Sequence, residues 1–288
     1  MADAIAEHAP AKVNLALHIT GQRADGYHLL DSLVVFTEAG DRITVEPADT
    51  DTFTISAPFG AGLDTGPDNL VIRARDRMRE LTAIAVPPTP VAIHLEKNLP
   101  VASGIGGGSS DAAATLRALC RLWGILPDSE DLDAIGLKLG ADVPMCVRAH
   151  TLVARGIGEE IEPARLPSLA MVLVNPGVAI STPAAFRALQ RKDNPPLPPV
   201  PDDASFEEIV EWLAGWTRND LEPPARSLAP EVGETLDALR DAGAALARMS
   251  GSGATCFGLF PSQAEAEAAA ARLAAAHPAW YVRATRTI

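Results

Sequence analysis

Glycines cluster in one short segment that has the composition of an anion-binding loop. Gly104 and Gly106–Gly108 lie within residues 100–110, between an expected strand and an expected helix. Glycine tolerates positive φ and lets the main chain approach a ligand closely. The first amides of a helix, together with its dipole, attract anions. The segment therefore predicts a phosphate site, and the glycines alone leave a ligand-free turn as the alternative.

Two familiar nucleotide motifs do not fit this segment. No Gly-Lys-Ser/Thr follows the glycines, so it is not a Walker A loop. Ser109 occupies the third glycine position of the dinucleotide fingerprint, and no suitable acidic residue ends the next strand. The sequence therefore argues against a dinucleotide-dependent oxidoreductase.

A lysine and an asparagine interrupt an apolar strand near the N-terminus. Lys12 and Asn14 are two residues apart, so their side chains share one face of the strand. A buried, unpaired ammonium is costly, which favours a functional site over simple core packing. The alternative is a polar face at an exposed sheet edge. Tyr27 and His28 follow the turn signal Asp25-Gly26, and they could stack on a ligand ring or pack in an ordinary way.

Two further segments contain groups suited to phosphate chemistry. Asp142 follows the helix stop Gly140 and precedes Pro144, which predicts a constrained loop. A carboxylate held there could ligate Mg²⁺ or accept a hydroxyl proton, and the alternative is a helix cap. The segment 249–255, Met-Ser-Gly-Ser-Gly-Ala-Thr, is a second glycine-rich turn that could offer amides to a phosphate or serve only as a tight connection.

Strands and helices that would position these groups can be placed from hydrophobic periodicity. The N-terminal half reads as strands within 11–56, a helix at 69–82, a strand at 91–95 and helices at 111–123 and 129–139. Ser109, Ser110 and Asp111 are expected to cap the helix at 111–123. The second half reads as a strand and turn at 151–159 and strands near 170–174, 254–260 and 281–284, with helices near 206–216, 230–241 and 264–276. The proline-rich stretch 194–201 must be a loop. The fold class is α+β in two domains, and we place them at 1–158 and 159–288.

Composition narrows the class of protein further. The chain has 288 residues and a formal net charge of -13, which argues against a general nucleic-acid binder. Three cysteines show no metal-binding or disulfide pattern. The N-terminal segment 1–9 lacks the basic region of a signal peptide, and no apolar run reaches the ~20 residues of a membrane span. We expect a cytoplasmic protein that does not act at a membrane.

In this order, four segments resemble the GHMP superfamily of small-molecule kinases. They are PAKVNLALHITGQRADGYH, LPVASGIGGGSSDAA, GADVP and MSGSGAT, and the resemblance runs from about Pro10 to Phe260. It implies a ribosomal protein S5 domain 2-like N-terminal domain and a ferredoxin-like C-terminal domain, with the active site in the cleft between them. It also implies ATP and Mg²⁺, the metal bridging phosphates with no direct protein ligand assigned. The implied acceptor is a cytidine diphosphate derivative of methylerythritol, and the expected assembly is a monomer or weak homodimer.

The resemblance carries over to individual positions. Lys12 and Asp142 match the catalytic pair of the family. Tyr27 and Phe186 match rings that sandwich cytosine, His28 matches the group that reads its edge, and Asn14 and Thr182 are expected to contact the acceptor. The implied nucleotide-binding residues are Asn69, Lys97, Pro100, Val101, Ala102, Ser103, Gly104, Ile105, Gly106, Gly107, Gly108, Ser109 and Ser110.

Two other functions stay open on the sequence. A mevalonate or homoserine kinase would share the glycine loop, but it would have no cytosine for Tyr27, His28 and Phe186 to hold. A non-catalytic sugar or nucleotide sensor would keep the fold, but it would not need both Lys12 and Asp142.

Overall fold

Alternating apolar residues in the N-terminal part of the chain form long strands. The computed structural model describes residues 4–82 and 89–288, so the first residues of the segment tested for a signal peptide lie outside the described part. Strands β1 (Ile5–Gln22) and β2 (His28–Pro47) pair with each other, and β2 also pairs with β4 (Val91–Glu96) in antiparallel fashion. Strand β3 (Thr52–Ser56) adds to β4 in parallel.

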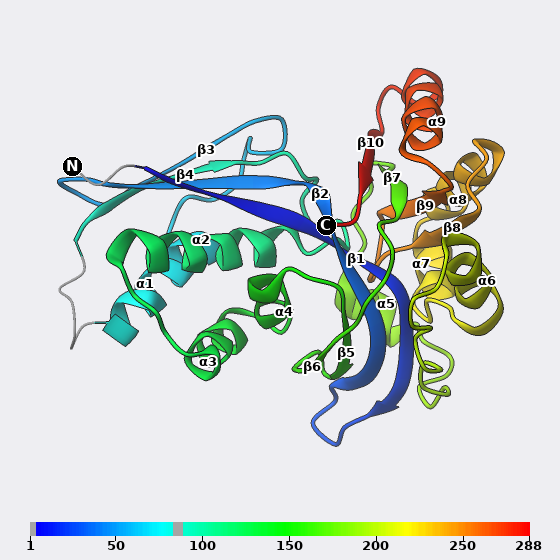
Figure 1. The fold of residues 1–288 in the computed structure, drawn as a ribbon, viewed down its shortest axis with the longest axis horizontal. Helices are drawn as coiled ribbons and strands as arrows, with labels where there is room; N and C mark the ends of the chain where they lie inside the picture. Colours follow the sequence, from blue (N-terminus) through cyan, green and yellow to red (C-terminus); the bar gives the residue numbers. More distant parts are fainter. Residues whose placement is uncertain (1–3, 83–88) are drawn as a thin grey trace. The chain divides into compact units, whose positions relative to one another are not determined.

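Four helices follow these strands in the first part of the chain. They are α1 (Leu70–Thr82), α2 (Gly107–Trp123), α3 (Ser129–Leu139) and α4 (Val143–Arg148). Helix α1 packs against α2, and α4 packs against both α2 and α3 (Figure 1). Asp128 caps α3 by accepting a hydrogen bond from the amide of Asp131 at 2.8 Å, and Gly140 ends it.

The rest of the chain builds a four-stranded antiparallel sheet with helices. Strands β5 (Leu152–Gly156) and β6 (Glu160–Pro163) extend β2, and the second sheet has the order β10-β7-β9-β8. Its strands are β7 (Ala170–Asn175), β8 (Leu246–Met249), β9 (Cys256–Phe260) and β10 (Tyr281–Arg286). The helices are α5 (Thr182–Arg187), α6 (Phe206–Trp216), α7 (Glu222–Leu228), α8 (Glu231–Asp241) and α9 (Gln263–Ala276).

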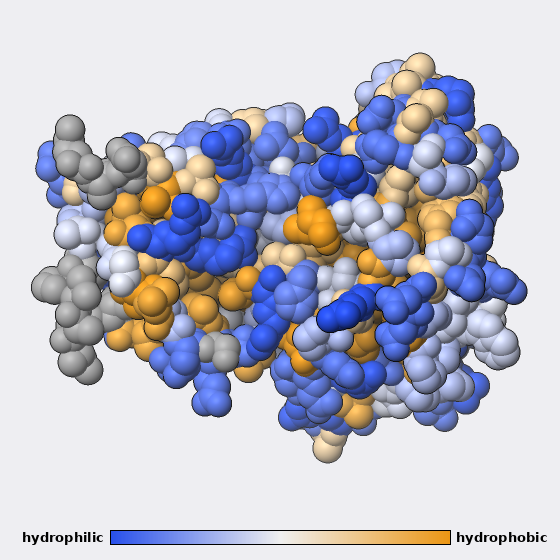
Figure 2. All heavy atoms as spheres, in the orientation of Figure 1, coloured by the Kyte–Doolittle hydropathy of each residue, from blue (hydrophilic) through white to orange (hydrophobic). Residues whose placement is uncertain are grey.

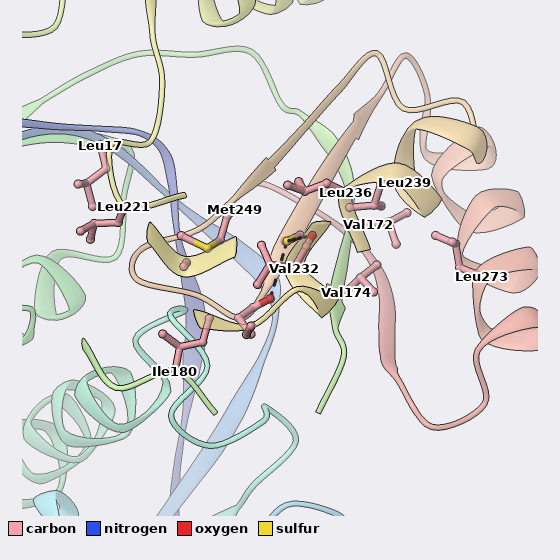
Figure 3. Packing of buried hydrophobic residues seen from close by; sticks show 14 of the residues in the cluster. Leu17, Val172, Val174, Ile180, Leu221, Val232, Leu236, Leu239, Met249 and Leu273 are labelled. Carbon is pink, nitrogen blue, oxygen red and sulfur yellow. Dashed lines mark hydrogen bonds between the residues drawn. The ribbon is translucent and has the colours of Figure 1, made fainter. Parts of the chain in front are cut away.

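A buried apolar cluster holds this second sheet to its helices. Val172 and Val174 of β7 face Leu236 and Leu239 of α8, with Leu273 of α9 beside them (Figure 3). Each fully buried aliphatic side chain of this kind stabilises the fold by ~1.5–3 kcal/mol. The cluster thereby fixes the ends of β8 and β9, where the second glycine-rich turn begins.

The described chain divides into two compact units that are discontinuous in sequence. The first comprises the described residues of Met1–Ala11, Gly40–Val101 and Gly106–Ala149. The second comprises Lys12–Ala39, Ala102–Ile105 and His150–Ile288. The expected boundary between residues 158 and 159 stays a prediction about family domains.

Most elements lie where periodicity predicts them, with one correction that affects the glycine segment. Helix α2 begins at Gly107, four residues before the expected start, and its N-cap is Gly106. The expectation that Ser109, Ser110 and Asp111 cap this helix is therefore wrong, because all three lie inside it. Glycines at 107 and 108 hid the helix start, since glycine disfavours helix interiors.

Short elements escaped prediction. Periodicity needs several turns to register, and the elements missed are α4, α5, α7, β6 and β8, none longer than seven residues. Among the described residues, the helices include none long and apolar enough to cross a membrane. Hydrophilic residues cover most of the face seen in Figure 2, with apolar residues gathered in smaller groups between them.

Candidate active site

The end of the glycine segment forms the first turn of α2. Gly106 adopts φ 66°, a left-handed conformation that glycine allows at little cost, and it turns the chain into the helix. The amide of Ser110 makes the first helical hydrogen bond, to the carbonyl oxygen of Gly106 at 2.9 Å. An α-helix offers no acceptor to the amides of its first turn, so the amides before Ser110 have none, and they point toward the N-terminal end of the helix. This geometry suits an anion such as phosphate.

The beginning of the glycine segment packs against the turn between β8 and β9. The hydroxyl of Ser250 donates to the carbonyl oxygen of Gly104 at 3.1 Å. The amide of Thr255 donates to the carbonyl oxygen of Ser103 at 3.0 Å. Gly104 has φ 77°, and a Cβ there would lie 2.6 Å from the carbonyl oxygen of Ser250. Ser103 and Gly104 therefore form one main-chain surface with the turn between β8 and β9 in the second unit.

Lys12 and Asn14 join this surface, as the shared strand face predicts. Both are buried, and the ammonium of Lys12 donates to Oδ1 of Asn14 at 3.1 Å. The amide nitrogen Nδ2 of Asn14 donates to the hydroxyl of Ser32, and the backbone amide of Asn14 donates to Ser250 Oγ at 3.0 Å. The backbone amide of Lys12 donates to the carbonyl oxygen of Ile105 at 2.9 Å. The alternative of an exposed sheet edge is therefore wrong for these two residues.

Asn219 supports the same turn and was not found from the sequence. Its side-chain amide is buried and donates to the carbonyl oxygens of Met249 and Gly251, at 2.8 and 2.9 Å. Its Oδ1 accepts from the amide of Leu221 at 2.9 Å, which starts the turn into α7. An asparagine between two helices gives no periodic signal, so only its long-range contacts reveal its role.

Three predicted ring-binding residues lie in the second unit. The imidazole of His28, at the start of β2, stacks on the ring of Phe186 in α5, with centroids 4.7 Å apart and planes inclined by 26°. Nε2 of His28 is buried and has no hydrogen-bond partner among the described residues. Burial lowers the pKa of His28, and the charge of Lys192 lowers it further. Tyr27, the residue before His28, is 60% exposed.

Thr182 also lies beside the second glycine-rich turn. It opens α5, and its hydroxyl is 2.8 Å from the hydroxyl of Ser252, with either group able to donate. Thr182 and Phe186 are four residues apart, so helix geometry places them on the same face of α5. The helix thus links the ring pair to the main-chain surface formed by the glycine turns.

Lys97, in the first unit, lies in a buried ionic cluster. Its ammonium is 2.5 Å from Oδ2 of Asp41 and 2.6 Å from Oδ2 of Asp111. Burial alone would lower the pKa of Lys97, but the two carboxylates raise it overall. The resemblance singled out Lys97, whereas the sequence suggested Asp111 only as a helix cap and did not single out Asp41.

Asn69 and Asp142 also belong to the first unit. Asn69 precedes α1, its Oδ1 accepting from the amide of Val71 at 2.9 Å and its Nδ2 donating to the carbonyl oxygen of Asp64. Asp142 is the residue before α4 and makes no capping hydrogen bond through its side chain. The alternative of a helix-terminal cap is therefore confirmed for the position of Asp142, the N-cap of α4, but not for a capping bond from its side chain. The partnership of Asp142 with Lys12 stays a prediction.

Two other observations bear on the site. A hollow of about 470 Å³ in the second unit is lined by Leu189, Arg191, Asn194, Asp220 and Pro224 among others, and none of the predicted site residues line it. In the described ranges, 4–82 and 89–288, no group of three or more histidine, cysteine or acidic side chains could hold a metal ion.

Comparisons with known proteins agree with the geometry. The model of the GHMP kinases N terminal domain matches residues 69–150, and that of the GHMP kinases C terminal domain matches residues 198–279. The chain is 59% identical over 285 residues to a 4-diphosphocytidyl-2-C-methyl-D-erythritol kinase of Rhizobium meliloti, covering 97% of this chain and 94% of the relative. It is 56% identical to the enzyme of the same name from Agrobacterium fabrum, and the match covers 98% of this chain and 96% of that relative.

Solved structures give the same result. A crystal structure of 4-(cytidine 5'-diphospho)-2C-methyl-D-erythritol kinase matches with a TM-score of 0.82 at 36% identity, covering 99% of this chain and all of that chain. A homoserine kinase from Cytophaga hutchinsonii matches with a TM-score of 0.71 at 20% identity, covering 100% of this chain and 95% of that chain. This match shows a shared fold.

Proposed function

Because this chain belongs to the GHMP kinases, and among them to the 4-diphosphocytidyl-2-C-methyl-D-erythritol kinases, we propose that it phosphorylates the compound named in that family. ATP donates its γ-phosphoryl group to the 2-hydroxyl of 4-diphosphocytidyl-2-C-methyl-D-erythritol. The products are ADP and the 2-phosphate of the acceptor. The reaction belongs to the non-mevalonate route to isoprenoid precursors.

The observation that carries the choice of acceptor is the ring pair of His28 and Phe186. A buried ring nitrogen that has no partner among the described residues is costly unless a ligand satisfies it. Cytosine offers both donors and acceptors on its edge, as well as a flat face. We propose that cytosine lies between Tyr27 and Phe186, with His28 bonded to its edge. Mevalonate and homoserine contain no ring, so they would leave these three side chains unused.

The glycine segment supplies the phosphate side of the reaction. We propose that the main chain of residues 100–110 holds the ATP phosphates, with the first-turn amides of α2 directed at them. Asn69 and Lys97 are proposed to lie near the adenosine. Mg²⁺ would enter with ATP and would neutralise part of the phosphate charge, and no protein ligand is assigned to it.

Phosphoryl transfer then needs a proton acceptor and a cation. We propose that Asp142 takes the proton of the acceptor hydroxyl as its oxygen bonds to the γ-phosphorus and the bond to the β-γ bridging oxygen breaks. Lys12 stabilises the negative charge that develops on the transferred group. Asn14 orients Lys12, because its Oδ1 accepts a hydrogen bond from the ammonium. Thr182 is proposed to contact the acceptor.

The proposal is tested by turnover with defined acceptors. The purified full chain is incubated with MgATP and 4-diphosphocytidyl-2-C-methyl-D-erythritol, with mevalonate or with homoserine, and ADP and the phosphorylated product are measured. We expect turnover with the first compound and a kcat/KM at least about a hundredfold lower with the other two. Turnover that favours mevalonate or homoserine would assign the chain to another acceptor. Nucleotide binding without turnover of any of the three would favour a sensor.

The assembly state and location remain predictions. A monomer or weak homodimer is proposed, and sedimentation of the purified chain tests it. A cytoplasmic location is proposed from the sequence.

A further inference from the structure

Two carboxylates beneath the glycine segment have no role in the function proposed above. Asp41 of β2 and Asp111 of α2 lie on either side of the Lys97 ammonium, and the three side chains are 0%, 5% and 4% exposed. Asp41 lies 56 residues before Lys97, and Asp111 lies 14 residues after it. The cluster therefore joins three parts of the first unit, which are strand β2, the residue that follows β4, and helix α2.

Asp41 fixes the chain just before the glycine segment. Its Oδ1 accepts from the amides of Asn98 and Leu99, at 2.5 and 2.8 Å, while its Oδ2 binds Lys97. Both oxygens are thus used, one for the ammonium and one for the main chain that leads into Pro100. A neutral side chain cannot accept from all three donors equally well.

Asp111 fixes the other end of the segment. It is the fifth residue of α2, and its Oδ2 binds the same ammonium that Asp41 binds. Its Oδ1 is buried and has no hydrogen-bond partner among the described residues. A buried carboxylate with one unsatisfied oxygen is a poor choice for stability alone, because its desolvation is only partly offset.

The ammonium of Lys97 also lies directly against the first turn of the helix. A Cβ on Gly107 would be 3.0 Å from Lys97 Nζ and 3.7 Å from Asp41 Oδ2. Gly107 is not among the residues with positive φ, so glycine is needed here for space and not for conformation. The cluster and the main chain that is proposed to bind phosphate are therefore in contact.

We propose that Asp41 and Asp111 are positioning residues for nucleotide binding, which through Lys97 hold both ends of segment 100–110 in its phosphate-binding conformation before ATP arrives. A loop held in its bound geometry loses less conformational entropy on binding, so affinity for the ligand rises. The inference rests on the proposed function, because it assumes that this segment binds the phosphates of ATP.

The charge of the cluster is compatible with this role. Burial raises the pKa of Asp111 to about 8, although the Lys97 ammonium opposes the shift. The Lys97 ammonium lies against both carboxyl groups and offsets negative charge of the cluster near the triphosphate. Asp41 and Asp111 can therefore position the loop without repelling the nucleotide.

The test uses the full chain and separates positioning from simple stabilisation. Asp111→Ala removes the link to α2, and Asp111→Asn keeps an oxygen for Lys97. Asp41→Asn replaces one of two acceptor oxygens by an NH2 group, which then faces either Lys97 or the amides of Asn98 and Leu99. Asp51→Asn is the matched control, because Asp51 also binds cations and a backbone amide, that of Val91 at the opposite end of β4. For each protein, MgATP affinity is measured by calorimetry, KM for each substrate by steady-state kinetics, and loop exchange by hydrogen–deuterium exchange.

We expect Asp111→Ala and Asp41→Asn to raise the Kd and KM for MgATP by about tenfold while the KM for the acceptor changes less than about twofold. Amides of residues 98–110 should exchange faster in both ligand-free variants. Asp111→Asn should recover most of the affinity, and Asp51→Asn should leave it unchanged.

Two results overturn different statements. If a folded Asp111→Ala or Asp41→Asn variant binds MgATP with unchanged affinity, whatever its melting temperature, the cluster stabilises the fold and does not position the loop for nucleotide binding. If Asp111→Ala does not fold, Asp41→Asn decides by the same criterion. Absence of MgATP binding by the unmodified chain would instead overturn the proposed function.

Discussion

The carbonyl oxygen of Gly104 accepts a hydrogen bond from the hydroxyl of Ser250, a residue 146 positions later in the chain. This bond joins the first glycine segment to the turn between β8 and β9. A methyl group at Gly104 would lie 2.6 Å from the carbonyl oxygen of Ser250 and 2.8 Å from that of Gly253. The main chains approach so closely that only glycine fits.

Gly104→Ala should therefore destabilise the protein and weaken nucleotide binding. Positive φ costs ~1 kcal/mol for alanine, and the clash with main chain adds ~1–3 kcal/mol because backbone atoms cannot move aside cheaply. We expect the free energy of unfolding in urea to fall by ~2–4 kcal/mol and the KM for MgATP to rise.

Gly62→Ala is the matched control for this substitution. Gly62 has φ 81° but nothing within 4 Å of an added Cβ, so only the conformational cost of ~1 kcal/mol applies. Equal losses in the two variants would show that the close approach of Gly104 to Ser250 contributes nothing.

Asp142→Asn should abolish most of the catalysis and leave nucleotide binding intact. An amide cannot accept a proton from the hydroxyl, and a general base contributes ~10²–10⁴ in rate. We expect kcat to fall at least about a hundredfold with the Kd for MgATP unchanged. Asp133→Asn, which removes a half-buried carboxylate paired with Arg148 of α4, should keep normal kcat. Near-normal turnover by Asp142→Asn would contradict the role of base.

Phe186→Ala should weaken binding of the acceptor selectively. Stacking of a base on an aromatic ring contributes ~1–3 kcal/mol, so the KM for the acceptor should rise by about tenfold or more while that for MgATP stays constant. Trp280→Ala is the control, because Trp280 stacks on His277 at 3.7 Å and has no proposed role in binding. A parallel loss of MgATP affinity in Phe186→Ala would point to general unfolding.

The stability of the protein should fall as pH rises toward 8, in part through Asp111. The pKa of Asp111 is raised to about 8 in the folded chain, whereas an unfolded aspartate titrates near ~3.9. Between these values the folded chain holds a proton that the unfolded chain has lost, so the free energy of unfolding decreases with pH across this window. Asp111→Asn should flatten the decrease in urea unfolding measured from pH 5 to pH 9.

Asp51→Asn is the contrasting variant, because the pKa of Asp51 is lowered in the folded chain whereas that of Asp111 is raised. Hydrogen bonds from Arg79 lower the pKa of Asp51 to about 2, so its contribution to stability is present above ~pH 4 and is lost as the pH falls toward 2. This variant should not change the slope between pH 5 and pH 9. An unchanged slope in Asp111→Asn would show that Asp111 is ionised throughout that range.

Local patterns in the sequence were sufficient for much of the fold. Helix α3 was predicted at its observed bounds, because Gly140 marks its end within the same short segment, and the structure adds the Asp128 cap. Helix α2 was placed too late, since Gly107 and Gly108 do not look helical although packing and the Gly106 turn hold them in the first turn. Short helices such as α4 and α5 depend on tertiary contacts, so their sequences carry little periodic signal.

The sequence by itself determined the order of the chemical segments, the shared face of Lys12 and Asn14, and the glycine turns, because these depend on residues close together in the chain. Only the tertiary structure brought Asp41 and Asp111 to Lys97, Asn219 to the turn at Met249–Gly251, and His28 to Phe186. Each of these contacts joins residues far apart in the chain. Burial and pairing of such groups follow from how whole elements pack, and no local periodicity encodes that packing.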